Sequence, residues 1–474
     1  MSGSRTRTLR AVAIMAVLLP SVTAFAQSDP QDLRQRGLEP TRVTNDALGV
    51  TIHPPLDSAA IPTQTGDSTI LTIRDGADPP AWQMFMQRTL MRDVRSDDPD
   101  EIIELLLSQL RRNNPSIQVL RNEARRLGGH PGHILFVQLE QEIGGFAIAA
   151  TGERRFLIVR MSIMPEVSER IRPILEASLG TLEITSAEQL RAQREAQTNR
   201  AQRFLGELTP ERFRSVLGRE HWYRIYQPSA DGSRTGEQEV GYFVVRTSEG
   251  MRGQLDPGRE ERHFTAGDRA PGLILHIDGR YLEDAARNLF TDVQSRYWQA
   301  WDRSDESWSI RATRRQGAAS RTEAEVGLRS GPRIGQPYGK VTVVTTDLQT
   351  RANQNYEWIA PDPYLSQVEV YLLGSLLPRD GSMTGELAFR YYEPSVKRLT
   401  ELPHRLDVWQ PSSRREGFWT LTSRLMIDTP PITSTYNAEG VLIRREKADG
   451  TITELIELRD LVELWRRKGL PTGD

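Results

Sequence analysis

The chain has 474 residues, contains no cysteine, and carries 61 basic against 63 acidic side chains. A chain without cysteine forms no disulfide, thiolate metal site or thiol nucleophile, and this length is sufficient for an ordinary hydrophobic core. Because the charges nearly cancel, a nucleic-acid partner, which requires a basic excess, is not expected.

Residues 1–26 show the order of charge and hydrophobicity that is typical of a bacterial Sec-type signal peptide. Three arginines precede an apolar stretch, and Ala24-Phe25-Ala26 is a small-x-small cleavage site. The stretch is too short to span a bilayer and contains Pro20. We therefore predict cleavage before Gln27 and a periplasmic or secreted protein that is not embedded in a membrane. The polar residues 27–42 are predicted to form a flexible leader.

Residues 43–185 combine strand and helix patterns in a fixed order. Short strand patterns lead to a helix that opens at Asp98-Pro99, two hairpins follow, and Pro165 begins a last helix. The first hairpin is expected to turn at residues 128–132, which are rich in glycine. An antiparallel sheet with helices collected on one face is an α+β domain.

This order of elements resembles the Mog1/PsbP-like family of small α+β domains. The resemblance covers about residues 49–184 and rests on the turn Leu127-Gly128-Gly129-His130-Pro131-Gly132 and the closing segment Ile174-Leu175-Glu176-Ala177-Ser178-Leu179. The matching residues are structural, so the resemblance implies no catalytic residue. It implies a binding or assembly module, a role that such domains have in unrelated systems.

Residues 186–217 are predicted to form a charged helical linker. Between residues 186 and 203 nearly every side chain is charged or polar, with Glu188, Arg191 and Glu195 at helical spacings. A helix without an apolar stripe is typically solvated. We therefore expect the domains on either side to fold independently.

Residues 218–474 are predicted to form a larger β-rich domain around one buried helix. Eight of the nine tryptophans lie here, so this domain has the larger core. Hairpin patterns precede and follow residues 362–377, where Asp362 is the expected N-cap and Pro363 occupies the first turn. Because this helix is apolar on most of its circumference, we expect it in the hollow of a curved antiparallel sheet.

The segments 236–242 and 434–442, together with the apolar helix, look like parts of lipoprotein-carrier-type (LolA-like) half-barrels. The likeness covers about residues 220–458 and implies a curved sheet that wraps around helices and can hold acyl chains. The strands of this chain are more highly charged than that pattern, which argues against an open lipid-sized cavity. If a cavity is present, its expected apolar lining is Leu365, Val368, Leu372 and Leu376.

No motif for catalysis, cofactor binding or metal binding is found, and we predict none of these sites. A nucleophile elbow, a helical zinc pair and a phosphate-binding loop are all absent from the sequence. The pair His130 and His133 is interpreted as part of a hairpin turn, because a metal site needs further ligands. Trp298, Trp301 and Trp308 can form a stacking platform for sugar, but alternating hairpin tryptophans more often fill a core.

Three functions remain open. The first is an exported, non-catalytic binding protein of the bacterial envelope that holds a lipid or another apolar partner in its second domain. The alternative is a structural or assembly factor that binds envelope proteins. The third is a hydrolase without a recognisable motif, since paired carboxylates need only meet in space.

Overall fold

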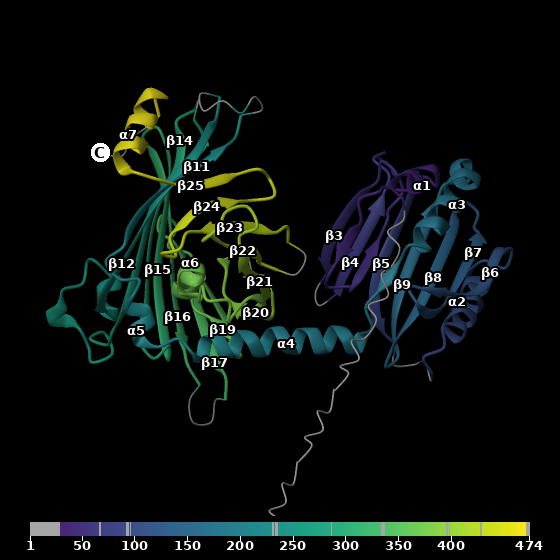
Figure 1. The fold of residues 1–474 in the computed structure, drawn as a ribbon, viewed down its shortest axis with the longest axis horizontal. Helices are drawn as coiled ribbons and strands as arrows, with labels where there is room; N and C mark the ends of the chain where they lie inside the picture. Colours follow the sequence, from purple (N-terminus) through teal and green to yellow (C-terminus); the bar gives the residue numbers. More distant parts are fainter. Residues whose placement is uncertain are drawn as a thin grey trace, which may run out of the picture.

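The computed structural model describes residues 29–470, apart from 66–67, 92–93, 95, 230–231, 233–235, 286, 333–336, 395–396, 398 and 427–428. The predicted signal peptide and its cleavage site lie outside the described residues. Figure 1 shows an N-terminal lobe (residues 29–186) and a C-terminal lobe (residues 207–470), joined by the long helix α4 (Ala187–Gly206). Antiparallel sheets combined with separate helices confirm the predicted α+β class.

The N-terminal lobe is built on an antiparallel sheet that is apolar on both faces. Its strands, in spatial order, are β3 (Ala59–Thr65), β4 (Ser68–Arg74), β5 (Trp82–Leu90), β9 (Arg155–Ile163), β8 (Ile143–Gly152), β7 (His130–Gln138) and β6 (Gln118–Leu127). On β7, Ile134 and Phe136 belong to one buried cluster, whereas Leu135 and Val137 belong to another. Because side chains alternate across a strand, each face needs its own covering layer.

Different helices cover these two faces. α2 (Pro99–Asn113) packs on the face of Leu135, and α3 (Ser168–Leu179), which follows the 3-10 turn η1 (Pro165–Val167), packs on the face of Phe136. A small sheet completes the second face with the strands β1 (Val43–Asn45), β2 (Val50–Ile52) and β10 (Glu183–Ile184). Helices therefore lie on both faces, not on one as expected, because the strands are apolar on both.

The segment expected to be a flexible leader contains ordered structure. α1 (Pro30–Gln35) starts at the N-cap Asp29, whose side chain accepts a hydrogen bond from the backbone of Gln31. Leu33 and Leu38 are buried, and Leu38 pairs with Pro55. These two leucines attach residues 29–42 to the N-terminal lobe.

The C-terminal lobe is a long curved sheet. Its strands, in spatial order, are β18 (Asn353–Ala360), β17 (Gly339–Asp347), β16 (Ala319–Ser330), β15 (Asp305–Gln316), β14 (Leu289–Ala300), β13 (Pro271–Asp284), β12 (Gln238–Met251), β11 (Glu220–Gln227), β25 (Ile452–Ile456), β24 (Leu442–Glu446), β23 (Ile432–Tyr436), β22 (Trp419–Arg424), β21 (His404–Pro411), β20 (Gly385–Tyr391) and β19 (Tyr364–Leu365). Neighbouring strands are antiparallel, except that β19 runs parallel to β20. The hairpin series expected from the sequence is thus one continuous sheet.

This sheet is closer to a closed barrel than the expected half-barrel. Its two edge strands, β18 and β19, are separated along the chain by residues 361–363 alone. A connection of that length spans about 14 Å at most. The ring of Trp358 on β18 lies 5.5 Å from that of Tyr392, which follows β20, and its indole nitrogen donates to the carbonyl oxygen of Leu399 at 3.0 Å. The two edges are therefore held together.

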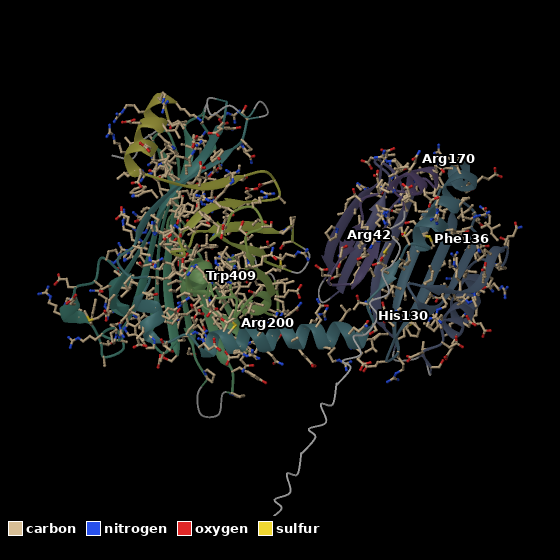
Figure 2. All side chains as sticks on the ribbon, viewed as in Figure 1. Arg42, His130, Phe136, Arg170, Arg200 and Trp409 are labelled. Carbon is tan, nitrogen blue, oxygen red and sulfur yellow. The ribbon has the colours of Figure 1, made fainter. Side chains whose placement is uncertain are left out.

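The buried helix is confirmed, but it begins later than expected. α6 (Gln367–Leu376) has Ser366 as its N-cap; the Ser366 hydroxyl accepts from the backbone of Glu369, and the Glu369 carboxylate accepts from the backbone of Ser366. This reciprocal capping box fixes the helix start. Asp362 is not the N-cap, because Tyr364 and Leu365 are extended and pair with β20. Figure 1 shows α6 enclosed by the sheet, and Figure 2 shows Trp409, another core residue, beside it.

The predicted linker helix, α4, is not solvated along its whole length. Ala201, Phe204 and Leu205 are buried in the core of the C-terminal lobe, and the Phe204 ring lies edge-on to Phe389 at 6.4 Å. Arg200, labelled in Figure 2, donates to the carbonyl oxygen of Glu386 at 2.8 Å. The sequence did not predict this contact of α4 with the core, because the buried apolar residues of the helix are confined to its last two turns.

The C-terminal lobe contains four further helical segments in the described chain. They are α5 (Pro210–Arg214), η2 (Arg252–Leu255), η3 (Glu261–His263) and α7 (Leu458–Arg467). α7 packs on the outside of the sheet through Leu461 and Trp465, which are both buried. Within the described ranges, no helix combines the length and apolar character needed to cross a membrane.

Candidate functional site

The strand register identifies which residues lie on the inner face of the large sheet. Leu275, Tyr297, Trp308 and Gly327 are direct cross-strand neighbours on β13 to β16, and they face α6. A Cβ atom at Gly327 would collide with the Trp308 indole, so glycine is required there. This part of the interior is filled. The inner face then divides into a polar zone at the start of α6 and an accessible zone beyond it.

The polar zone surrounds Glu369, which is fully buried. Arg303 donates to Glu369 Oε2 at 3.1 Å, and Gln299 Nε2 donates to Oε1 at the same distance. Burial alone would raise the pKa of Glu369, but the Arg303 guanidinium, together with hydrogen bonds from Ser366 and Gln299, holds that pKa below its ordinary value. The pair is therefore charged in the folded protein.

Glu306 is the second buried carboxyl group at the start of α6. Its Oε1 accepts from the Tyr364 hydroxyl and its Oε2 from the backbone nitrogen of Gln367, both at 2.7 Å. Burial raises the pKa of Glu306 to about 7, against the opposing effects of the Tyr364 hydrogen bond and the nearby Arg329. Glu306 thus titrates near neutral pH inside the core.

Arginines hold the opposite end of α6. Arg212 donates twice to the carbonyl oxygen of Leu376, at 2.9 and 3.0 Å, and Arg379 donates to that of Gly374 at 2.8 Å. Carboxylates at the N-terminus and cations at the C-terminus complement the helix dipole. The polar zone and these arginines therefore hold α6 at both of its ends.

The accessible zone lies on the inner face where α6 does not fill it. Phe243, Tyr281 and Ile310 face inward on β12, β13 and β15, as the register shows. Tyr371 projects from α6 into the same region; its hydroxyl oxygen lies 3.3 Å from that of Tyr297. Tyr281 and Tyr371 remain 36% and 38% exposed, although they lie inside the curved sheet. We call Phe243, Tyr281, Ile310, Tyr371 and Arg445 the inner aromatic surface.

The pKa values of Tyr281 and Tyr371 show how far protein surrounds these two side chains. Burial raises the pKa of Tyr281 to about 12; Tyr371 adds to the shift and Arg445 opposes it. Burial likewise raises the pKa of Tyr371. A side chain that is surrounded by protein and still meets solvent lines a concave surface. Solvent, or a ligand in its place, therefore reaches the inner face here.

Arg445 is the cation of this surface. It faces inward on β24 between its register partners Ser434 and Thr453, and its Nε donates to Ser434 Oγ at 3.2 Å. No carboxylate among the described residues lies within ion-pair distance of it. Arg405, by contrast, is buried and paired with Asp407 at 2.8 and 3.0 Å. Arg445 therefore keeps capacity for an anionic group from outside.

The residues predicted as a cavity lining come together in the structure. Leu365, Val368, Leu372 and Leu376 all lie in the large core cluster, at 7% exposure or less. Their role as a cavity lining stays a prediction. The sequence did not single out Tyr281 or Arg445, and it placed Tyr371 only within the buried helix of residues 362–377. Their shared face depends on strand register, which pairs residues that lie far apart in the sequence.

The two histidines of the pair lie on opposite faces of one strand and contact different groups. His130 and His133 belong to β7, and the hairpin turns at Gly128 and Gly129 alone, so the turn is shorter than the expected 128–132. His130 contacts the carbonyl oxygen of Ile184 at 3.1 Å, whereas His133 contacts Asp100 Oδ1 at 2.5 Å. Figure 2 shows His130 at the end of its strand. In the part of the chain that the structure describes, no group of three or more metal-ligating side chains occurs.

The three hairpin tryptophans do not form a common platform. Trp298 packs with Leu255 and Ile274 on the outer face, and Trp308 faces inward into the main core. Both are 1% exposed, so their prediction as core residues is confirmed. Trp301 lies beneath the guanidinium of Arg214 at 4.9 Å.

No protein-family model matches the chain, and no curated protein matches it. Among solved structures, cyanobacterial PsbP (CyanoP) from Synechocystis sp. is similar, with 9% identity over 31% of this chain and 92% of its own, at a TM-score of 0.25. A β-barrel-like protein of a domain of unknown function (DUF1849) from Brucella abortus shares 11% identity over 50% of this chain and 95% of its own, at a TM-score of 0.31. Identities and scores this low carry no argument about function.

Proposed function

We propose that the protein is an exported, non-catalytic binding protein of the bacterial envelope. Its C-terminal lobe binds a lipid-like molecule that has an apolar body and an anionic head. The observation that carries this proposal is the accessible inner aromatic surface, where Tyr281 and Tyr371 meet solvent beside Arg445, which has no carboxylate partner among the described residues.

The two parts of such a ligand match two parts of the surface. Transfer of apolar area from water onto Phe243, Tyr281 and Ile310 provides a favourable contribution of about 25 cal/mol per Å². The planar guanidinium of Arg445 suits a carboxylate or phosphate oxygen pair. Because α6 is hydrogen-bonded at both ends, the surface is formed before binding, which lowers the entropic cost.

Export is proposed from the signal sequence alone. The charge order and the Ala24-Phe25-Ala26 site support cleavage before Gln27. Sequencing the N-terminus of the protein recovered from the cell envelope tests this step. A mature N-terminus at Met1 contradicts export by this route.

Binding is tested with two fluorescent probes of equal length, dansyl-undecanoate and the neutral dansyl-undecanol. The carboxylate probe should bind more tightly, and Arg445→Gln should weaken it about tenfold, to the affinity of the alcohol. Arg444→Gln is the matched control, because Arg444 is the next residue on β24, faces the other side and pairs with Glu446. It should leave both affinities unchanged.

The results of these binding measurements distinguish the carrier function from the assembly function. If the unmodified protein binds neither probe, the carrier function is excluded and the envelope assembly role becomes the better one. If both probes bind and Arg445→Gln affects neither, the head-group assignment is wrong. A second variant, Tyr371→Ala, should weaken both probes alike, since it removes apolar contact area without removing charge.

A further inference from the structure

A second groove lies on the outer face of the same sheet, where β11 to β15 run side by side. It has a volume of about 460 Å³. Aromatic side chains border one end, and charged side chains from β12 to β15 form its floor. None of these residues belongs to the inner aromatic surface, since they occupy the alternate register positions of the strands. We call this site the outer groove and define it by Trp222, Tyr242, Arg246, Asp278, Asp292 and Arg311.

The aromatic end of the outer groove is held in place. Trp222 donates through its indole nitrogen to Glu220 at 2.8 Å, and its ring lies 6.3 Å from that of Tyr242. Tyr242 meets the buried Trp465 of α7 edge-on, at 4.7 Å and 82°. Trp222 is only partly buried, so it provides a positioned aromatic surface at the rim. The apolar C–H face of a pyranose ring packs on such a surface.

The floor presents planar hydrogen-bonding groups at fixed positions. Arg246 donates to Asp278 at 3.0 Å, and Asp292 accepts from Arg280 at 2.6 Å and from Arg315 at 3.0 Å. Each of these groups is oriented by its neighbour and retains further donor or acceptor positions. Fixed donors and acceptors beside an aromatic ring match the alternating hydroxyl groups and apolar faces of a sugar.

Arg311 is an exposed cation of the outer groove. It is exposed in the outer groove, and no carboxylate in the described part of the chain pairs with it. The neighbouring Arg246 and Arg315, in contrast, are neutralised by carboxylates. One free guanidinium suits a single carboxylate, which it binds through two parallel hydrogen bonds. A polynucleotide would need several unpaired cations along its path.

We propose that the outer groove binds a short acidic oligosaccharide. A uronate carboxylate lies on Arg311, and the face of a sugar ring packs on Trp222. This site is separate from the proposed lipid site, and it provides the protein with a second class of envelope ligand. The two sites face opposite sides of one sheet, so occupation of either leaves the other open.

The test is calorimetric titration of the full chain with tetragalacturonate and with the neutral maltotetraose. Tetragalacturonate should bind, and maltotetraose should bind at least about tenfold more weakly. Arg311→Ala should remove this preference by weakening tetragalacturonate about tenfold. Arg314→Ala is the control: Arg314 lies on the same strand, faces the other side and pairs with Glu283, and its removal should change neither affinity.

Trp222→Leu should weaken both sugars, and its circular dichroism spectrum shows whether it folds. If it does not fold, Trp222→Phe, which keeps a smaller aromatic ring, replaces it and should weaken both sugars to a lesser extent. Failure of the unmodified protein to bind tetragalacturonate overturns the proposal. Equal binding of the neutral sugar, or an unchanged affinity in Arg311→Ala, overturns it too. Tighter binding of a single-stranded oligonucleotide than of tetragalacturonate assigns the groove to nucleic acid instead.

Discussion

In the N-terminal lobe, α2 and α3 pack on their sheet through aliphatic side chains such as Ile103 and Leu175, whereas α6 in the C-terminal lobe is also held by buried charges. The buried charged residues of the described chain all lie in the C-terminal lobe. They are Arg224, Glu239, Glu306, Glu325, Arg329, Glu369, Arg405 and Asp407. The two lobes therefore use different means to fix a helix against a sheet.

This difference has a physical reason. A helix on one face of an open sheet is oriented by the shape of that face, and apolar contacts suffice. A helix that is apolar on most of its circumference and surrounded by a curved sheet has apolar contacts at many rotations. Hydrogen-bonded charges at both ends of α6 select one rotation, which places Tyr371 toward the accessible zone.

The largest expected effect comes from breaking a buried ion pair. Arg303→Leu leaves Glu369 buried and uncompensated and should lower the free energy of unfolding by about 3–5 kcal/mol. Urea denaturation followed by tryptophan fluorescence reports on this lobe, which holds eight of the nine tryptophans. Adding Glu369→Leu should recover part of the loss. In the N-terminal lobe, Arg121→Leu removes an accessible pair with Glu176 and should cost about 1 kcal/mol or less.

Replacing a buried leucine by alanine should lower the free energy of unfolding by a similar amount in both lobes. Leu376→Ala on α6 and Leu175→Ala on α3 each remove a fully buried side chain and should cost about 2–5 kcal/mol. Separate urea transitions of the two variants measure both costs. If Leu376→Ala is nearly neutral, residual space lies around Leu376 itself, and its place in the packed core is wrong.

The pH dependence of stability should be specific to the C-terminal lobe. The pKa of Glu306 is about 7 in the folded protein against an ordinary 4.5, so the folded state binds a proton that the unfolded state has lost between these values. Stability due to this group is therefore greatest below pH 4.5 and falls as the pH rises to 7, by about 3 kcal/mol in total. Glu306→Gln should abolish this trend. A difference between parent and variant that stays constant from pH 4.5 to 8 contradicts the prediction.

The smallest expected effect concerns the helix caps. Ser366→Ala removes the N-cap of α6, and Asp98→Ala removes that of α2; each should cost about 1 kcal/mol. The Ser366 cap is buried and bonded to Glu369, whereas the Asp98 cap is exposed. The cost at Ser366 should therefore be the larger of the two in denaturation experiments, and equal costs would show that burial adds nothing to this cap.

The sequence predicted the elements of the fold better than their contacts. Local patterns indicated the hairpins and the buried helix, and the spacing Ser366-x-x-Glu369 was a readable capping box, although Asp362-Pro363 resembled a helix start more closely. The ion pair of Arg303 and Glu369 was not predictable, because the two residues are 66 positions apart.

Two neighbouring arginines show that sequence patterns also could not predict the candidate site. Arg444 and Arg445 are identical in type, and only the register of β24 decides which one faces inward. That register includes a bulge between Thr435 and Tyr436 on the adjoining strand, which no local pattern indicates. The inner aromatic surface therefore became visible only once the strand pairing was known.

The short connection between β18 and β19 has a consequence for self-association. An open sheet leaves rows of unpaired backbone groups at its two edges, and these rows can recruit strands from other molecules. Here residues 361–363 bring the two edges together, and Trp358 and Tyr392 bridge them. A strand from another molecule that adds to one edge would therefore meet the opposite edge, and this nearness disfavours growth of the sheet by strand addition.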